Sequence, residues 1–446
     1  MKDSDRSNKL LNDRKDSLHN ILDQLPHRKF SKRKVGVTAV GSRGAVARSL
    51  NDSIGNECLL NSKDELLPGS TSLMMIGSAF LRLIEGEYRL MKSIIPTEHQ
   101  ELILDKLVDK SLLNFLTEYE TVYSRAKNSL TSKKEFLVVI PLFRMIKHMN
   151  ALLPGYQAIL EKSLAKSHTR IQSLNIRCGE LAIRFLEEFI GEISSQPCKI
   201  TAVPKDGTVH EMTSQTMSFM EQLLEHVGTA GPLWAAKDSS LARIQEPELL
   251  ATKGMASCQH RILSTLTMKL EGKATCYENM CLRNIFLLNN YHFIRKTLTR
   301  SPTMIPLLEQ EMADLEDKFN ELIGKQRKGY TVYAFAKLTT HIEDSVPVPE
   351  GTEKLNTPLK QSIKDRFKGF NNEIDEIVRV QRSFSIPDPY LRESLRTENN
   401  NLVYPLYSEF YSAYYKAPFT KNPEKYLKYN PDEVSDMLMS LFDSTS

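Results

Sequence analysis

The chain has 446 residues, of which 41% are apolar and 26% charged, with 59 basic against 55 acidic residues. This composition excludes a wholly disordered chain, and the formal charge of +4 is too small to indicate a nucleic-acid-binding protein. The length predicts about three domain-sized helical blocks.

The chain shows no membrane-spanning run and no signal peptide. A stretch of about 18 consecutive apolar residues is absent, and residues 1–30 alternate in charge without an apolar core. We therefore expect no transmembrane helix and a cytoplasmic protein.

The N-terminal part predicts little regular structure. Within residues 1–25 the leucines and one isoleucine are roughly periodic, which favours a short helix. Residues 26–70 show no sustained period and are rich in Gly, Ser and Asn, so we predict a flexible, basic linker. Its basic run at 28–34 (RKFSKRK) is a candidate for a second membrane contact.

From residue 104 onward, apolar residues recur at the spacing of amphipathic helices. Four stripes advance mostly by three or four residues, which keeps one face of each helix against its neighbours in a bundle. Their members are Leu107, Val108, Leu112, Phe115, Tyr119, Val122 and Ala126; Ile171, Leu174, Cys178, Leu181, Phe185, Phe189 and Ile193; Ile305, Leu308, Met312, Leu315, Phe319 and Leu322; and Ile363, Phe367, Phe370, Ile374, Ile377 and Phe384, with Gln381 interrupting the last. No comparable period-two alternation appears, so the predicted fold class is all-α.

Two breaks indicate where helical bundles begin and end. The stretch 203–209 is typical of a turn, because Gly207 can adopt the positive φ that turns often need. The stretch 345–357 contains two prolines and a glycine, and it separates the third stripe from the fourth. We predict helical bundles over 71–200, 201–345 and 346–446, without a repeat of about 30–45 residues.

The sequence contains no linear motif for catalysis or metal binding. Phosphate-loop, dinucleotide-binding and His-Glu-x-x-His patterns are absent. His210 and Glu211 can be interpreted as an acid–base pair, but the exposed polar start of a helix is favoured. Cys276 and Cys281 are close in sequence without further zinc ligands, so half-buried thiols are favoured. We expect that the chain is not an enzyme and has no catalytic residue, metal or cofactor.

The segment 415–430 carries two helix-start signals. Asn422 suits an N-cap, Pro423 the first helical position, and Glu424 complements the helix dipole. Asn430 begins a second signal of the same kind. The helix after it is expected to bury one apolar face, formed by Val434, Met437, Leu438, Leu441 and Phe442.

The same segment contains four lysines. On the first predicted helix Lys425 and Lys428 are three residues apart, Lys421 precedes Lys425 by four, and Lys416 is nearby, so they are expected to point roughly the same way. Near an anionic membrane each lysine contributes about 1 kcal/mol. A site for acidic phospholipid headgroups and a solvated helix face both stay open. The aromatic neighbours, expected to pack inward or lie at the membrane interface, are Tyr415, Phe419, Tyr426 and Tyr429.

Four longer stretches together carry a family resemblance. They read VPKDGTVHEMT at 203–213, IFLLNNY at 285–291, RFKGFN at 366–371 and PFTKNPEKY at 418–426. In this order, and over roughly residues 75–446, the chain resembles the family of the seventy-kilodalton subunit of the exocyst, the complex that tethers secretory vesicles to the plasma membrane.

This resemblance implies an elongated rod of stacked antiparallel helical bundles whose C-terminal tip binds phosphatidylinositol bisphosphate. Lys425 and Lys428 match lysines that the family uses for this binding, whereas Lys421 and Lys416 are added here from helix spacing. The implied partners are other exocyst subunits, a Rho-family GTPase and an actin-nucleating complex, and no nucleic acid. The implied location is peripheral, on the inner face of the plasma membrane at sites of secretion.

Some points stay open at this stage. Family members carry a long N-terminal coiled-coil region that docks them onto other subunits, whereas only residues 1–70 precede the helical part here. Arg366 and Lys368 can assist lipid binding or serve packing with solvated charges. Two alternatives are a Rho-GTPase effector or actin-linked scaffold without direct lipid binding, and a helical enzyme with a deep pocket but no linear motif.

Overall fold

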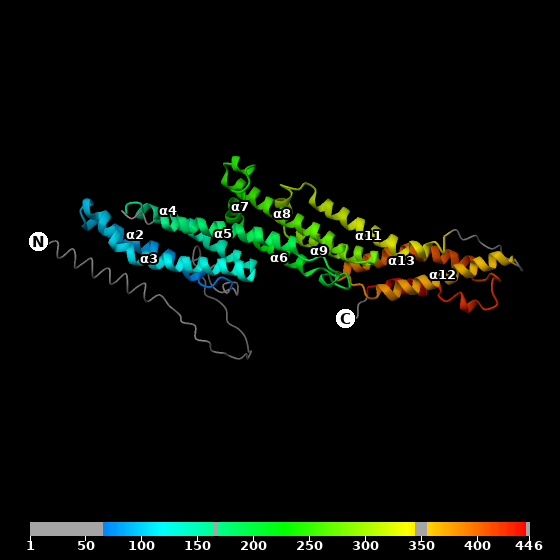
Figure 1. The fold of residues 1–446 in the computed structure, drawn as a ribbon. Helices are drawn as coiled ribbons and strands as arrows, with labels where there is room; N and C mark the ends of the chain where they lie inside the picture. The colour runs from blue at the N-terminus through cyan, green and yellow to red at the C-terminus, as the bar shows by residue number, and fades with distance from the viewer. Residues whose placement is uncertain (1–65, 164–167, 344–354, 443–446) are drawn as a thin grey trace, which may run out of the picture. The chain divides into compact units, whose positions relative to one another are not determined.

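The computed structural model describes residues 66–163, 168–343 and 355–442, and every regular element within these ranges is a helix (Figure 1). The predicted all-α class is confirmed for this part of the chain. The predicted helix at 1–25, the basic run at 28–34 and nearly all of the predicted linker lie outside the described residues. Only the end of that linker is described, and there Leu67 is buried.

The chain forms two compact units, Met1–Glu187 and Glu188–Ser446. The boundary lies close to the one predicted at residue 200 and falls within a helix. The predicted division at 345 and the stacking of bundles into a rod stay predictions.

The described part of the first unit is built from α2 (Ser70–Ile94), α3 (Thr97–Asn128), α4 (Val139–Leu160) and most of α5 (His168–Ser195). The connection from α3 to α4 contains two short helical turns, Ser129–Lys133 and Phe136–Val138. All members of the first predicted stripe are buried in α3, which confirms that stripe. Phe80, Phe115 and Tyr156 form the aromatic centre of this unit, with ring centroids 5.8–6.0 Å apart.

Within the described residues, one stretch, Phe136–Leu160, is long and apolar enough to cross a membrane by length and composition alone. Its apolar side chains serve the core of the first unit, where Leu142, Phe143 and Met149 are fully buried. The imidazole Nε2 of His148 lies 2.8 Å from the Ser78 hydroxyl of α2. Packing within the unit therefore explains the hydrophobicity of this helix.

The second unit contains the rest of the helices. They are the end of α5, α6 (Glu211–Leu223), α7 (Val227–Ala235), α8 (Pro247–Ala274), α9 (Met280–Arg300), α10 (Met304–Leu308), α11 (Leu315–Thr339), α12 (Thr357–Gln381), α13 (Pro389–Tyr414) and α14 (Pro431–Met439), with single turns at Ile200–Ala202, Leu224–His226, Leu241–Arg243 and Pro423–Lys425. The main helix pairs are α7 with α8, α9 with α11, and α13 with α14. The second predicted stripe lies on α5 and is buried except for the half-buried Phe189, whose ring packs on Phe219.

The third predicted stripe does not lie on one helix, so that prediction is wrong. The chain leaves α10 after Leu308, and α11 begins only at Leu315. Between them Asp314 has a φ of 55°, a left-handed conformation that aspartate tolerates better than most residues. The spacing of apolar residues cannot reveal such a break, because the same spacing of three and four residues continues across it by coincidence.

The fourth predicted stripe is confirmed along α12 and the residues after it, all of whose members are buried. Gln381 does not open this seam to water, since it is itself only 3% exposed. Its side-chain carbonyl accepts a hydrogen bond of 2.6 Å from the Tyr330 hydroxyl, which also accepts one from the Asn399 amide. The polar residue is thus paired inside the core.

Candidate functional site

Residues 415–430, here called the lysine segment, connect α13 to α14 (red in Figure 1). Phe419 is 2% exposed, and its ring stacks on Phe367 of α12 with the centroids 5.8 Å apart. The side-chain amide of Asn371, also in α12, donates to the Tyr426 carbonyl at 2.8 Å. Contacts with α12 therefore fix the path of this segment.

The C-terminal end of the lysine segment is held equally well. The Tyr407 hydroxyl of α13 donates to the Tyr429 carbonyl at 2.7 Å. Asn430 caps α14, because its side chain accepts from the Glu433 backbone and the Glu433 carboxylate accepts from the Asn430 backbone. The predicted helix start at Asn430 is thus confirmed. Of the predicted apolar face, the buried members are Val434, Leu438, Leu441 and Phe442, while Met437 is half-buried.

The helix predicted from Asn422 is wrong in its extent. Only Pro423–Lys425 form a single 3-10 turn, and the Asn422 side chain caps nothing. Lys421 and Lys428 therefore lie outside it, and helical spacing gives the lysines no common face. The physical reason is tertiary, because the anchoring of Phe419 on α12 overrides the local start signals.

Lys428 is already engaged within the protein. Its ammonium lies 2.6 Å from the Asp375 carboxylate of α12 and 4.7 Å from the Tyr429 ring centroid. The hydrogen bond with Asp375, followed by that with Tyr429, raises the pKa of Lys428. Burial opposes ionisation of Asp375, but the bonds from Lys428 and Tyr429 outweigh it and lower the pKa of the carboxyl group.

The other predicted lysines differ from Lys428. Lys421 and Lys425 are exposed, and no hydrogen bond or ion pair with another described residue engages either ammonium. The Lys416 ammonium lies 5.2 Å from the centroid of the Tyr415 ring. Two ammonium groups of the predicted four are therefore open to an external anion.

The aromatic residues of the segment divide between core and surface. Phe419 packs inward, and the half-buried Tyr426 ring meets its edge at 6.1 Å. The Tyr429 hydroxyl donates to Asp375 at 2.6 Å. Tyr415 remains 44% exposed and stacks on Tyr411. Inward packing thus describes most of these rings.

Two further lysines of α12, Lys360 and Lys364, were missed by our sequence reasoning, which named only Lys368 among the lysines of this helix. Lys360, Lys364 and Lys368 are spaced by four residues, and each is at least partly exposed. On the helix surface Lys364 and Lys368, four residues apart, lie on the same side of Phe367, whose ring contacts Phe419 of the lysine segment. The spacing of these three lysines was the signal that could have found them.

Arg366 lies in the same helix but serves packing. Its Nε donates to the His341 carbonyl at 2.8 Å, at the end of α11. Its guanidinium carbon lies 4.7 Å from the Phe410 ring centroid. Of the two residues considered for lipid binding, only Lys368 is exposed.

The first two signature stretches, at 203–213 and 285–291, meet in the interior of the second unit. The Asn290 side-chain carbonyl of α9 accepts from the Thr213 hydroxyl at 2.6 Å and from the His210 backbone at 3.0 Å. The Asn289 amide donates to the carbonyls of Gly207 and Ser385, both at 2.8 Å. Gly207 has a φ of 76°, as predicted for a turn glycine. These polar residues hold three chain segments together, which is a structural role.

His210 is the N-cap of α6 and not one half of an acid–base pair. Its Nδ1 accepts from the Met212 backbone at 3.0 Å, and its Nε2 bonds the Ala202 carbonyl at 2.9 Å. Both ring nitrogens are thus occupied. The helix-start interpretation is confirmed, although the imidazole is half-buried where we expected it exposed.

We predict that the second unit loses stability as the pH falls below about 6.5, the usual pKa of histidine. Burial lowers the pKa of His210, even though the Ala202 carbonyl acts in the opposite sense. The unfolded chain therefore takes up a proton that the folded chain resists. Urea unfolding between pH 7.5 and 5 measures this slope.

The variant His210→Asn provides the control, because asparagine can cap the helix but does not titrate. Its unfolding free energy is expected to fall by about 1 kcal/mol at pH 7.5 and to vary less with pH. Some slope remains, since burial also lowers the pKa of His292. An unchanged pH slope in the variant would contradict this role of His210.

Cys276 and Cys281 are both half-buried, as predicted, and burial raises the pKa of the Cys281 thiol to about 11. Among the described residues, no group of His, Cys, Asp and Glu is arranged to hold a metal ion.

Comparison with known proteins places the chain among exocyst proteins. The family model for the C-terminal part of the Exo70 exocyst complex subunit matches residues 71–440. The exocyst complex component 7 of Homo sapiens is 32% identical over 90% of this chain and 54% of its own length. The protein of the same name from Drosophila melanogaster is 28% identical over 90% of this chain and 58% of its own length. The chain therefore spans little more than half the length of these relatives.

Solved structures agree in fold. The crystal structure of the S. cerevisiae exocyst component Exo70p matches with a TM-score of 0.51 and 17% identity, over 84% of this chain and 73% of that one. A structure of S. cerevisiae Exo70 with additional residues matches with a TM-score of 0.50 and 19% identity, over 81% and 68% of the two chains. At these identities the similarity supports the shared helical fold alone.

Proposed function

Because the chain belongs to the Exo70 family of exocyst proteins, through the C-terminal part of that family, we propose that it is an exocyst subunit that tethers secretory vesicles to the inner face of the plasma membrane. Relatives that it matches over most of its own length are named as exocyst components. The proposal includes a cytoplasmic, peripheral location and no catalytic step.

We propose further that the lysine segment binds phosphatidylinositol bisphosphate. The observation that carries this is the exposure of Lys421 and Lys425 without an internal partner, on a segment that Phe419 anchors to α12. Ordering such a segment on binding costs little conformational entropy, because its backbone is already fixed. Lys364 and Lys368 extend the basic surface along α12.

Lys428 has a different part in this proposal. Its ammonium must exchange the Asp375 carboxylate for a lipid phosphate, so its net gain is smaller than that of a free lysine. Its ion pair also holds the C-terminal end of the segment against α12. We therefore assign the main attraction to Lys425 and Lys421, with Lys428 as a contributor and Lys416 as a peripheral cation.

The proposed partners are other exocyst subunits and a Rho-family GTPase.

Four lysines near an anionic leaflet contribute about 4 kcal/mol, which corresponds to roughly millimolar binding. Such an affinity needs avidity from an assembled complex to hold a vesicle in place. A membrane contact and a protein assembly therefore belong to one mechanism.

The experiment is co-sedimentation with liposomes that contain or lack phosphatidylinositol bisphosphate. The wild-type chain is expected to pellet only with the acidic lipid. Lys421→Ala/Lys425→Ala is expected to weaken binding about 30-fold, from two lysines at about 1 kcal/mol each. Lys428→Ala is expected to weaken it less, by about five-fold or under.

A matched control is Lys106→Ala/Lys110→Ala, which removes two exposed lysines of the same spacing from α3. Its binding is expected to equal that of the wild type. If the control loses as much as Lys421→Ala/Lys425→Ala, the attraction is general and the segment is no lipid site. If the wild-type chain fails to pellet, the alternative of a GTPase effector or actin-linked scaffold replaces the lipid proposal.

A further inference from the structure

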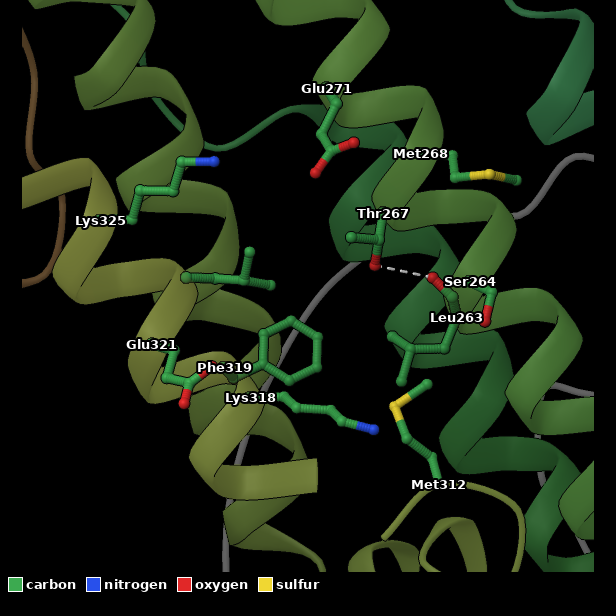
Figure 2. Close-up of a pocket in the computed structure, with 11 residues that line it drawn as sticks. Leu263, Ser264, Thr267, Met268, Glu271, Met312, Lys318, Phe319, Glu321 and Lys325 are labelled. Carbon is green, nitrogen blue, oxygen red and sulfur yellow. Dashed lines mark hydrogen bonds between the residues drawn. The ribbon is translucent and has the colours of Figure 1, made fainter. Parts of the chain in front are cut away.

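Each unit exposes an apolar surface that no described helix covers. In the second unit it is an open groove of about 480 Å³ between α8 and α11 (Figure 2). Figure 2 shows the Lys325 ammonium and the Glu271 carboxylate extending into this groove from opposite walls. Lys318 and Glu321 add one charge of each sign to the lining, so its charge selects no partner. In the first unit the surface is the outer face of α2, and for this face the chain itself supplies an occupant.

The outer face of α2 is an uncharged stripe. Leu73 and Ile84 face the core of the first unit. Along another side of the helix, residues at helical spacing form a second set without any charged member: Ser72, Met75, Ile76, Ala79, Leu83, Gly86, Leu90 and Ile94. Met75, Leu90 and Ile94 are 64%, 40% and 59% exposed. A surface helix normally has one apolar stripe and charges elsewhere, so a second stripe indicates a contact surface.

Two small residues shape this stripe. Ala79 and Gly86 are seven residues apart, so they lie two turns apart on the same side of α2. A Cβ added at Gly86 would meet no atom within 4 Å, so the space above this residue is open. The large side chains of an adjoining helix fit into such low points between Met75, Leu83 and Leu90. The stripe therefore has the relief of a helix-packing surface.

Residues 1–25 provide a matching stripe. Among the stretches outside the described residues, this one has apolar residues at helical spacing, namely Leu10, Leu11, Leu18, Ile21, Leu22 and Leu25. From the first to the last of them a helix rises about 22 Å, and the stripe of α2 extends about 33 Å. Arg14 is the one charged residue on this side between them, and its long side chain can reach solvent at the edge. Because burying an unpaired charge is costly, the uncharged face of α2 favours such a segment over a highly charged helix.

The connection to α2 permits docking within one chain. Residues 26–65 separate this segment from the described part, and α2 begins at Ser70. A flexible chain of about 40 residues has a root-mean-square span of roughly 35 Å, which is close to the length of α2 itself. Such a tether gives an effective concentration in about the millimolar range. A second copy or a separate protein therefore competes at a disadvantage.

We propose that residues 1–25 form an amphipathic helix that docks along the outer face of α2 in the same chain. The driving force is the mutual burial of the two apolar stripes. The docked helix covers the exposed side of the first unit, and its release opens that side to other proteins.

Photo-cross-linking in the full chain tests this docking. A benzophenone side chain is introduced at Met75, and the cross-linked peptides are identified by mass spectrometry. The partner peptide is expected to come from residues 1–25, in protein that migrates as a monomer. The control position is Met268, which is 66% exposed in the second unit. There this product is expected to be at least about ten-fold less abundant.

Gly86→Glu tests the α2 side of the contact without disturbing the fold. Because the space around Gly86 is open, a glutamate finds room in the first unit, but it places a charge beneath a docked helix. The cross-link from Met75 is expected to fall at least about ten-fold. Gly191→Glu is the matched control, since Gly191 is a helical glycine of α5 that also has open space around it. This control is expected to leave the cross-link unchanged.

Leu18→Glu/Leu22→Glu tests the other side of the contact and is expected to reduce the cross-link equally. Its control is Asn12→Glu/Asn20→Glu, which adds the same charge on the opposite side of the predicted helix. We expect this control to cross-link as the wild type does.

Three results would overturn the proposal. The first is a cross-link to residues 1–25 that appears only in a covalent dimer, which would mean that two copies exchange this segment. The second is a cross-link from Met75 to α2 of another copy, which would make this face a dimer interface. The third is the absence of any cross-link to residues 1–25, which would leave the outer face of α2 to a different protein.

Discussion

Gly231→Ala is expected to lower the free energy of unfolding of the second unit by about 3 kcal/mol. Gly231 lies in α7, where a methyl group would overlap the Ala251 carbonyl oxygen of α8. Gly254 of α8 is the counterpart, since its added methyl group would overlap the Gly231 carbonyl oxygen. A backbone atom cannot rotate aside as a side chain can, so the two helices have to separate.

Urea unfolding followed by circular dichroism measures this effect. Gly324→Ala is the matched control, because Gly324 is also helical but has open space around its missing side chain. There the substitution is expected to raise stability by about 0.5–1 kcal/mol, through the better helix propensity of alanine. A Gly231→Ala protein as stable as the wild type would show that α7 and α8 can move apart at little cost.

Phe419→Ala is expected to release the lysine segment and, with it, most of the lipid binding. A buried phenylalanine contributes about 3–5 kcal/mol relative to alanine. This energy holds a segment that has only one short helical turn of its own. We expect faster amide exchange across residues 418–429 and at least about ten-fold weaker co-sedimentation, while the distant helices stay protected.

Tyr415→Ala is the control for this prediction. Tyr415 is an aromatic residue of the same segment, but it is 44% exposed and stacks on Tyr411 at the surface. Its removal is expected to leave amide exchange at 418–429 unchanged. If Phe419→Ala binds lipid as well as the wild type, the lysines act as a flexible charge cluster and the fixed geometry of the segment is irrelevant.

The sequence alone determined those helical elements whose local signals, such as apolar spacing or an N-cap, were not overridden by tertiary contacts. The stripe along α12 is buried as the spacing of Ile363, Phe367 and Phe370 predicts. Asn430 caps α14 through its own neighbour Glu433, at a separation of three residues. Both signals are local, because the residues that decide them lie within one or two helical turns.

The sequence also identified the four lysines, but it did not show which of them is paired inside the protein and which is open to a ligand. Spacing on a helix predicted one face for Lys421, Lys425 and Lys428, yet the segment forms only a single turn. Lys428 is distinguished by Asp375, which lies on another helix and 53 residues earlier in the chain. No periodicity links two residues at that separation.

Only the tertiary structure decided which polar residues are structural and which are open to a ligand. His210 can be interpreted from the sequence as one half of an acid–base pair, but its ring and backbone bond Ala202 and Asn290 inside the second unit. The third stripe is typical of one continuous core helix, but the break at Asp314 divides it between α10 and α11, and it leaves Met312 and Leu322 partly exposed while Leu308, Leu315 and Phe319 are buried. The local sequence determines where helices form, because helical hydrogen bonds join residues that are four apart. The exposure and the ion pairing of a side chain depend instead on which helices pack together. Contacts between residues distant in sequence decide that packing.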